Sequence, residues 1–261
     1  MSFLDDILRR KRDEVAERRR EVGEAELEAR AARAPTPQGL FERLSPPGGP
    51  ARVIAEVKRA SPSAGAIRAD LDAVTQARRY AEGGAVAISV LTDGPGFGGS
   101  LADLEACREA VSAPLLRKDF VLERYQLLEA RAWGADAALL IVAALSPAEL
   151  ARLAAEAAAL GLEALVECHD EAEFDAALAA GARLVGINNR DLRSFRVDLG
   201  VSERLLPRAP AGVRVVVESG VRTVEDAARL RAAGAANFLV GEALVRAADP
   251  AALLGAIGAL P

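Results

Sequence analysis

The segment RVIAEVK, residues 52–58, is an apolar run that ends in charged side chains. Successive side chains of a strand point to opposite faces, so Ile54, Glu56 and Lys58 share one face. Charges on the inward face at the end of a strand are typical of the mouth of an α/β barrel, where catalytic side chains gather. A purely structural ion pair between Glu56 and Lys58 is the alternative interpretation.

Seven further apolar runs follow this one, and a helix-like segment comes after each of them. The predicted strands are residues 52–58, 85–92, 114–118, 136–143, 162–167, 183–188, 213–218 and 236–241. Strands that alternate with helices predict right-handed crossovers and a parallel sheet, and no hairpin signal interrupts the alternation. Eight such units favour a single (β/α)8 TIM barrel, of class α/β, over an open doubly wound sheet.

The sequence before the first strand predicts an amphipathic helix over residues 3–32, with apolar side chains along one face. The basic cluster at 9–12 is interleaved with acidic residues, so we interpret it as a solvated helix face rather than an anion-binding arm. We expect residues 1–50 to form a helical extension that packs on a barrel of residues 51–261, the two together making one domain.

The composition excludes several classes of protein. A net charge of −5 with interspersed signs provides no basic field for nucleic acid and no cationic face for a membrane. Cys107 and Cys168 are too few for a disulfide framework, and the charged N-terminus lacks the apolar stretch of a secretory signal. We therefore expect a cytoplasmic protein, a monomer or weak homo-oligomer, with a small-molecule substrate.

Three other predicted strands also end in side chains that can move protons. Lys118 shares the inward face of Leu116, whereas Arg117 should point toward the helices; Glu167 and Glu218 end their strands facing inward. A lysine in such a place can be a general acid, an anion ligand or a Schiff-base former, and spacing does not choose among them. Several inward carboxyls allow burial to keep one protonated as an acid.

The turns after the last two predicted strands contain Ser219, Gly220 and Gly241. Glycines at these turns let backbone N–H groups approach a phosphate closely, and barrels commonly bind phosphate there. Plain turn glycines are the alternative. The hydroxyls of Ser61 and Ser63 are further candidates for the same phosphate oxygens. The pattern predicts a phosphorylated substrate.

Two other features are interpreted as structural or as part of a substrate loop. The segment GPGFGG, residues 94–99, formally matches a dinucleotide fingerprint, but it lies in a longer barrel repeat, where Phe97 could stack on a planar ring. His169 is the sole histidine, and such a residue after a strand is usually solvated or a helix cap. Cys168 should face away from the barrel interior. We expect neither a metal site nor a thiol nucleophile.

The motifs together resemble the indole-3-glycerol phosphate synthase family over nearly the whole chain. The matching stretches are LDDILRRKRDEV, IAEVKRASPSAG, ISVLTDGPGFGGS, LLRKDF, LVECHD, GINNRDL, VVESGV and FLVGEALVR. The resemblance implies ring closure of 1-(2-carboxyphenylamino)-1-deoxyribulose 5-phosphate to indole-3-glycerol phosphate. Carbon dioxide and water would be lost, and no cofactor would be needed.

The resemblance also implies roles for individual residues. The implied catalytic set is Glu56, Lys58, Lys118, Glu167, Asn188 and Glu218. The residues implied to line the ring or phosphate sites are Ser61, Phe97, Phe120, Arg190, Ser219, Gly220, Gly241 and Glu242. The chain departs from the family at Ala64, where a lysine is common, and at Glu242, where a serine is common. A carboxylate would repel phosphate, so we expect Glu242 to offer its backbone N–H and to turn its side chain away.

Two other functions remain open from the residues alone. A Schiff-base aldolase on the same barrel would use Lys58 or Lys118 as its nucleophile. A non-catalytic phosphosugar-binding barrel is disfavoured, because binding alone does not require several interior glutamates beside two lysines.

Overall fold

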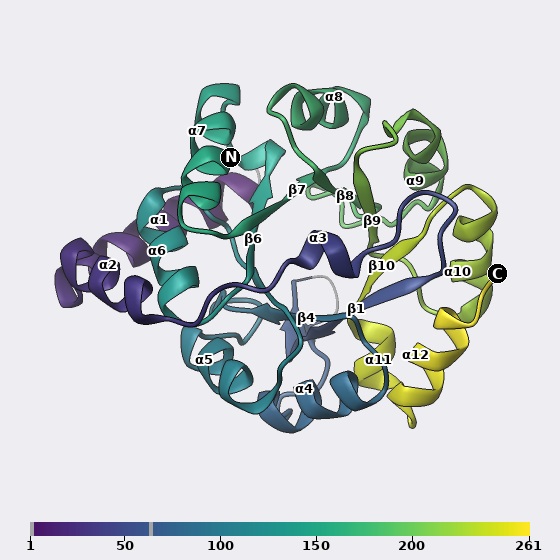
Figure 1. The fold of residues 1–261 in the computed structure, drawn as a ribbon, viewed down its shortest axis with the longest axis horizontal. Coiled ribbons are helices and arrows are strands. Elements are labelled where there is room, and N and C mark those ends of the chain that lie inside the picture. Colours follow the sequence, from purple (N-terminus) through teal and green to yellow (C-terminus); the bar gives the residue numbers. More distant parts are fainter. Residues whose placement is uncertain (1–2, 63–64) are drawn as a thin grey trace.

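The computed structural model describes residues 3–62 and 65–261, in which eight parallel strands close into a barrel (Figure 1). These are β1 (Arg52–Val57), β4 (Ala87–Leu91), β5 (Leu115–Lys118), β6 (Ala137–Ile141), β7 (Glu163–Cys168), β8 (Leu184–Asn188), β9 (Arg214–Glu218) and β10 (Asn237–Val240). Strand β1 pairs with both β4 and β10, and this pairing closes the barrel. The predicted (β/α)8 architecture is confirmed.

Helices follow the strands and form an outer ring around the barrel (Figure 1). They are α4 (Ala73–Glu82), α5 (Leu101–Ala110), α6 (Arg124–Ala132), α7 (Pro147–Ala159), α8 (Glu171–Ala179), α9 (Gly200–Leu205), α10 (Val224–Ala232), α11 (Glu242–Arg246) and α12 (Pro250–Gly258), with short 3₁₀ turns η1 (Val142–Ala144) and η2 (Leu206–Arg208). The side chains of Ser100, Asp170 and Thr223 accept hydrogen bonds from backbone N–H groups in the first turns of their helices. These N-caps fix where the helices begin.

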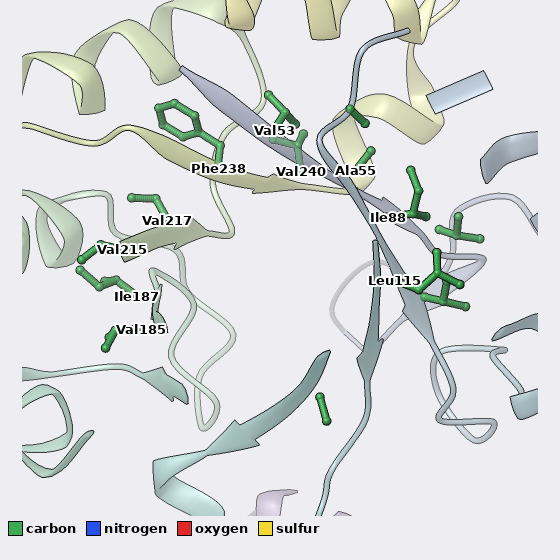
Figure 2. Close-up of a cluster of buried hydrophobic side chains, with 14 of the residues drawn as sticks. Val53, Ala55, Ile88, Leu115, Val185, Ile187, Val215, Val217, Phe238 and Val240 are labelled. Atoms are coloured by element: carbon green, nitrogen blue, oxygen red, sulfur yellow. The ribbon is translucent and has the colours of Figure 1, made fainter. Parts of the chain in front are cut away.

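Alternation along the strands divides the core into an inner and an outer layer. Ile54, Leu116 and Leu165 belong to the cluster that fills the barrel interior. Val53, Ala55 and their counterparts on other strands belong to the cluster between strands and helices, part of which Figure 2 shows. Inward side chains near the carboxyl ends of the strands therefore meet above an apolar floor.

The N-terminal extension consists of two helices rather than the single one predicted, α1 (Phe3–Glu21) and α2 (Glu24–Arg33). The break falls at Gly23, which is the N-cap of α2 and has an extended backbone. Glycine is a poor helix former and is accepted at an N-cap, so it ends the helical run here. Helix α2 packs on α6, with Leu27 and Leu128 in one buried cluster.

A short helix, α3 (Leu40–Arg43), lies across the barrel axis at the amino ends of the strands (Figure 1). Leu40 and Phe41 pack into the interior cluster. The Phe41 N–H donates to Glu163 Oε2 at 2.7 Å, and Arg214 Nε donates to the Leu44 carbonyl at 3.2 Å. Both partners, Glu163 and Arg214, begin strands, so α3 covers the end of the barrel at which the strands begin.

Helix α1 is held at the other end by a buried lysine, which corrects the prediction that the basic cluster at 9–12 is solvated. Lys11 has a side-chain exposure of 0%, and its Nζ lies 2.7 Å from Asp93 Oδ1 and 2.9 Å from Asp119 Oδ1. Asp93 and Asp119 follow β4 and β5. Lys11 continues the apolar stripe of Ile7 and Val15 at a spacing of four residues, which is the signal that placed it on the buried face.

A second difference concerns the loop after β1, where no hairpin is predicted. Strands β2 (Ala60–Ser61) and β3 (Gly65–Ala66) form a short antiparallel pair there. Two residues are too few to produce an alternating pattern, so the sequence gives no strand signal. Ser63 and Ala64, which carry two of the sequence interpretations, lie outside the described residues.

We predict that Lys11→Met lowers the free energy of unfolding by about 3 kcal/mol, because it removes the buried cation shared by Asp93 and Asp119 and leaves Asp93 with the more distant Arg10, at 3.6 Å. Urea unfolding at pH 7 measures the change. Arg9→Met is the matched control on the same helix: Arg9 is 61% exposed and pairs with Asp6, so the loss should stay below about 1 kcal/mol. Equal losses in the two variants would contradict the role given to Lys11.

Candidate active site

The candidate site is a pocket at the carboxyl ends of the barrel strands. Every residue of the predicted set lines it: Glu56, Lys58, Ser61, Phe97, Lys118, Phe120, Glu167, Asn188, Arg190, Glu218, Ser219, Gly220, Gly241 and Glu242. These residues are far apart in the sequence, and barrel closure brings them to one rim.

Lys118 lies at the centre of the charged groups. Its Nζ is 3.1 Å from Glu167 Oε2 and 3.2 Å from Glu218 Oε2, so one ammonium bridges the ends of β5, β7 and β9. Both carboxyl groups are almost fully buried. Gly186 of β8 leaves room for Glu218, because a Cβ at this position would clash with Glu218 Oε1. Arg117 points outward as predicted and pairs with Glu129 of α6.

The two carboxyls beside Lys118 have opposite pKa shifts. Burial favours the neutral form of both, but Lys118 and His169 outweigh it at Glu167, and the pKa of Glu167 lies well below its usual value. Burial dominates at Glu218, where the negative charge of Glu167 adds to it, and raises the pKa to about 8. One glutamate is therefore an ionised base and the other a protonated acid near neutral pH. The pKa of Lys118 rises despite burial, because Glu167, Glu218 and Glu56 favour its charged form.

Glu56 and Lys58 form a second charged pair on the inward face of β1. Lys58 Nζ lies 2.6 Å from Glu56 Oε1, and both side chains are largely buried. A Cβ at Gly241 would clash with this Glu56 oxygen. Gly241 thus makes space for a carboxylate in addition to any contact with a ligand.

Aromatic and apolar side chains form the wall beside these charges. The rings of Phe97 and Phe120 have centroids 6.3 Å apart and are tilted by 52°, leaving an apolar surface suited to a planar ring. Phe3 and Ile7 of α1 also line the pocket, and Phe3 contacts Phe195 edge to face at 4.8 Å. The sequence interpretation missed these contributions from α1, because nothing local connects that helix with loops far along the chain.

The turns after β9 and β10 contribute Ser219, Gly220 and Gly241 to the pocket lining. Ser219 and Gly220 both have left-handed backbones, with φ of 60° and 92°. Asn189 holds the turn by donating through its side-chain amide to the carbonyls of Glu218 and Ser219. The guanidinium groups of Arg190 and Arg222 also belong to the pocket lining, and Arg222 was missed by the sequence interpretation. Backbone turns that share a pocket lining with two arginines make this part of the site suited to an anion.

The departure from the family pattern at Glu242 has a local explanation. Glu242 Oε1 accepts a hydrogen bond from Arg246 Nε at 3.0 Å, one turn along α11. That the side chain turns away from a bound phosphate stays a prediction.

Two residues at the end of β7 are interpreted as structural from the sequence. The position of Cys168 agrees with that interpretation, whereas the position of His169 does not. Cys168 lies in the layer between strands and helices, and burial raises the pKa of its thiol. His169 is neither solvated nor a helix cap: its side chain is 12% exposed and lies between Glu167 and Glu173. Within residues 3–62 and 65–261, no three His, Cys, Asp or Glu side chains are grouped so that they could hold a metal ion.

The sequence pattern of the family described as "Indole-3-glycerol phosphate synthase" matches residues 4–257. The chain is 51% identical over 251 residues to the "Indole-3-glycerol phosphate synthase" of Acidithiobacillus ferrooxidans, with 95% of each chain covered. It is 48% identical to the protein of the same name from Opitutus terrae, with 96% of each covered. With that of Mycobacterium ulcerans the identity is 50%, over 96% of this chain and 92% of the relative.

Solved structures with low sequence identity share the fold. The 3-hexulose-6-phosphate synthase from Salmonella typhimurium has a TM-score of 0.64 at 15% identity, covering 80% of this chain and 97% of that one. The N-acetylmannosamine-6-phosphate 2-epimerase from Clostridium perfringens has a TM-score of 0.60 at 15% identity, covering 79% and 90%. These likenesses concern the barrel alone. None of the described helices has the length and apolar character needed to cross a membrane.

The raised pKa of Glu218 predicts a pH-dependent effect of Glu218→Gln on stability. Between about pH 4.5 and 8 the folded protein keeps the Glu218 proton that the unfolded chain releases, so this carboxyl makes the wild type less stable as the pH rises. Glutamine does not ionise, so the melting temperature of Glu218→Gln relative to wild type should increase from pH 5 to pH 8.

The control for this measurement is Glu203→Gln, at a partly exposed site where a hydrogen bond from Arg229 lowers the carboxyl pKa. Glu203 is ionised in both folded and unfolded chains throughout this pH range, so its variant should keep a constant difference. A constant difference for Glu218→Gln as well would show that Glu218 is ionised at neutral pH.

Proposed function

The chain belongs to the indole-3-glycerol phosphate synthase family, and we propose that Lys118, Glu167 and Lys58 perform the proton transfers of its reaction. The enzyme closes the ring of 1-(2-carboxyphenylamino)-1-deoxyribulose 5-phosphate with loss of carbon dioxide and water, in tryptophan biosynthesis. The observation that carries the proposal is the position of Lys118 between an ionised and a protonated glutamate. Glu56, Asn188 and Glu218 complete the proposed catalytic set.

Ring closure needs a proton at the ribulose carbonyl oxygen. The aromatic carbon that carries the carboxylate attacks the carbonyl carbon, and the carbonyl oxygen takes a proton from Lys118. Loss of carbon dioxide then returns the bonding electron pair to the ring, which becomes aromatic again. Protonated Glu218, 3.2 Å from Lys118 Nζ, is placed to return a proton to the amine.

Dehydration needs an acid and a base together. In our assignment Lys58 protonates the departing hydroxyl, and ionised Glu167 accepts the proton from the neighbouring carbon. Glu56 holds Lys58 in place through their ion pair. The two lysines thus serve successive steps, with Lys118 acting first and Lys58 second.

We assign substrate binding to the remaining lining residues. Phe97 and Phe120 would contact the aromatic ring, and Ser61 lies at the same rim. The substrate phosphate would lie between the turns that hold Ser219 and Gly241. The phosphate would also contact Gly220, Arg190 and the backbone N–H of Glu242. The presence of all three residues in the pocket lining supports this assignment.

We further propose a cytoplasmic enzyme that works as a monomer or weak homo-oligomer, with residues 1–50 and the barrel acting as one domain. The unpaired, buried cysteines support a reducing compartment. Contacts of α1 and α3 with opposite ends of the barrel support the single domain.

Lys118→Ala should lower the rate of ring closure by about 10²-fold to 10⁴-fold, because loss of a positioned general acid typically lowers the rate by this factor. Indole fluorescence follows product formation, and titration with substrate should show binding within about tenfold of wild type. Removal of the cation leaves two buried carboxyls, so circular dichroism must show that the variant is folded. A folded variant with near-normal turnover would contradict the assignment. Trapping by borohydride in the wild type would instead indicate a Schiff base.

Gly220→Ala should weaken the binding of substrate and of inorganic phosphate together by at least about tenfold. Gly220 has φ of +92°, and a Cβ would lie 2.6 Å from Leu199 Cδ2, so the turn must move. Thermal protection by phosphate measures the affinity. Gly212→Ala is the control, because its Cβ would meet no atom of the described residues within 4 Å. Undiminished protection of Gly220→Ala would place the phosphate elsewhere.

A further inference from the structure

His169, the only histidine of the sequence, stands directly after β7 and is fixed by one residue of α8. Its Nδ1 lies 2.9 Å from Glu173 Oε2, and its backbone N–H donates to the same oxygen at 2.9 Å. An imidazole held at both its ring and its backbone has a defined orientation. The remaining ring nitrogen, Nε2, therefore points in a direction set by Glu173.

That direction is toward Glu167. His169 Nε2 lies 3.4 Å from Glu167 Oε1, whereas the other oxygen of this carboxylate, Oε2, lies 3.1 Å from Lys118 Nζ. The two oxygens of Glu167 are thus divided between two cationic side chains. Nε2 is buried and has no full hydrogen bond among the described residues, so Glu167 is the acceptor within its reach.

We propose that His169 is a positioning residue for catalysis: held by Glu173, it orients Glu167 and keeps it ionised. The inference rests on the role proposed above for Glu167 as the base of dehydration. An ordered row of charges, Glu173, His169, Glu167 and Lys118, runs from α8 to the centre of the pocket. A carboxylate held by two cations cannot rotate freely, so its lone pair stays aimed at one place.

The charges around His169 agree with this role. Glu167 faces it from β7 and Glu173 from α8, with Lys118 and Glu218 beyond Glu167; Asp170 is occupied in capping α8. Burial lowers the pKa of His169, but the two facing glutamates outweigh it and raise the pKa to about 10. The ring remains an imidazolium at neutral pH, with a proton on each nitrogen, and Nε2 presents its proton to Glu167.

A structural role for the same residues is the alternative, because Glu173 lies in the first turn of α8. Its bond to the His169 backbone N–H would support the start of that helix whatever the side chain at position 169. Variants of His169 keep this backbone bond. They therefore separate the effect of the imidazole on Glu167 from the stability of α8.

Nuclear magnetic resonance of untagged protein tests the pairing directly, since one histidine gives one set of imidazole ¹⁵N signals. We expect both nitrogens to remain protonated in the wild type up to pH 8. In Glu167→Gln the imidazole pKa should fall by at least one unit, because one facing charge is lost. A neutral wild-type ring at pH 7, or an unchanged pKa in Glu167→Gln, would overturn the proposal.

Kinetics of two His169 variants test the effect on the reaction. Asparagine can replace Nδ1 toward Glu173 but does not reach Glu167, so His169→Asn should lower kcat about tenfold at pH 7, with KM changed less than about threefold. The acid limb of its kcat profile should shift upward by about one pH unit, because Glu167 loses a cation. Glutamine can place a donor near the Nε2 position, so His169→Gln should recover part of kcat.

Asp170→Ala is the matched control, because it removes the cap of α8 and leaves the imidazole in place. It should keep the wild-type pH profile. If His169→Asn gave that same profile, or if Asp170→Ala reproduced its shift, the positioning role would be wrong. Normal turnover by Glu167→Gln would instead contradict the proposed role of Glu167, and the ¹⁵N signals would still decide whether imidazole and carboxylate are paired.

Discussion

The structure depends on the parallel closure of one sheet, in which β1 pairs with both β4 and β10. Closure leaves the barrel without an open edge and directs every strand toward the same rim. Because side chains alternate, the last inward residue of each strand points into a common space. Charged groups that would be far apart in an open sheet then lie close together above the apolar interior of the barrel. Each buried charge needs an oppositely charged or hydrogen-bonding partner, because its burial is otherwise costly.

Charge compensation explains how the ends of the barrel are organised. At the rim, Lys118 neutralises one glutamate and leaves a second protonated, so identical side chains acquire opposite chemistry from their surroundings. The same requirement holds α1 in place, because its buried Lys11 pairs with Asp93 and shares Asp119 with Arg117 of β5. Asp119 directly follows Lys118 in the chain. The position of α1 is thereby linked to the strand end that carries the proposed acid.

Apolar runs that alternate with helix-like segments were sufficient to predict the eight strands. The two-residue repeat along each strand then predicted the inward direction of Glu56, Lys118, Glu167 and Glu218, and both signals are local in the sequence. The partners of Lys11 and His169 could not be predicted in this way, because each contact depends on how a helix meets a loop. The family resemblance identified the lining residues, but it did not reveal that α1 reaches the pocket or that His169 faces Glu167.

Two glycines leave room for buried carboxyl groups that the sequence pattern does not predict. Gly241 was interpreted only as a turn glycine near phosphate, yet its missing side chain accommodates Glu56 as well. Gly186, inside β8, was given no role, although Glu218 occupies the volume that a Cβ would fill. A glycine inside a strand weakens the strand, so its presence requires a compensating contact. At Gly186 that contact is made by the buried carboxyl of Glu218. The strand lacks a packed side chain at this position, and the proposed acid occupies the space beside Lys118.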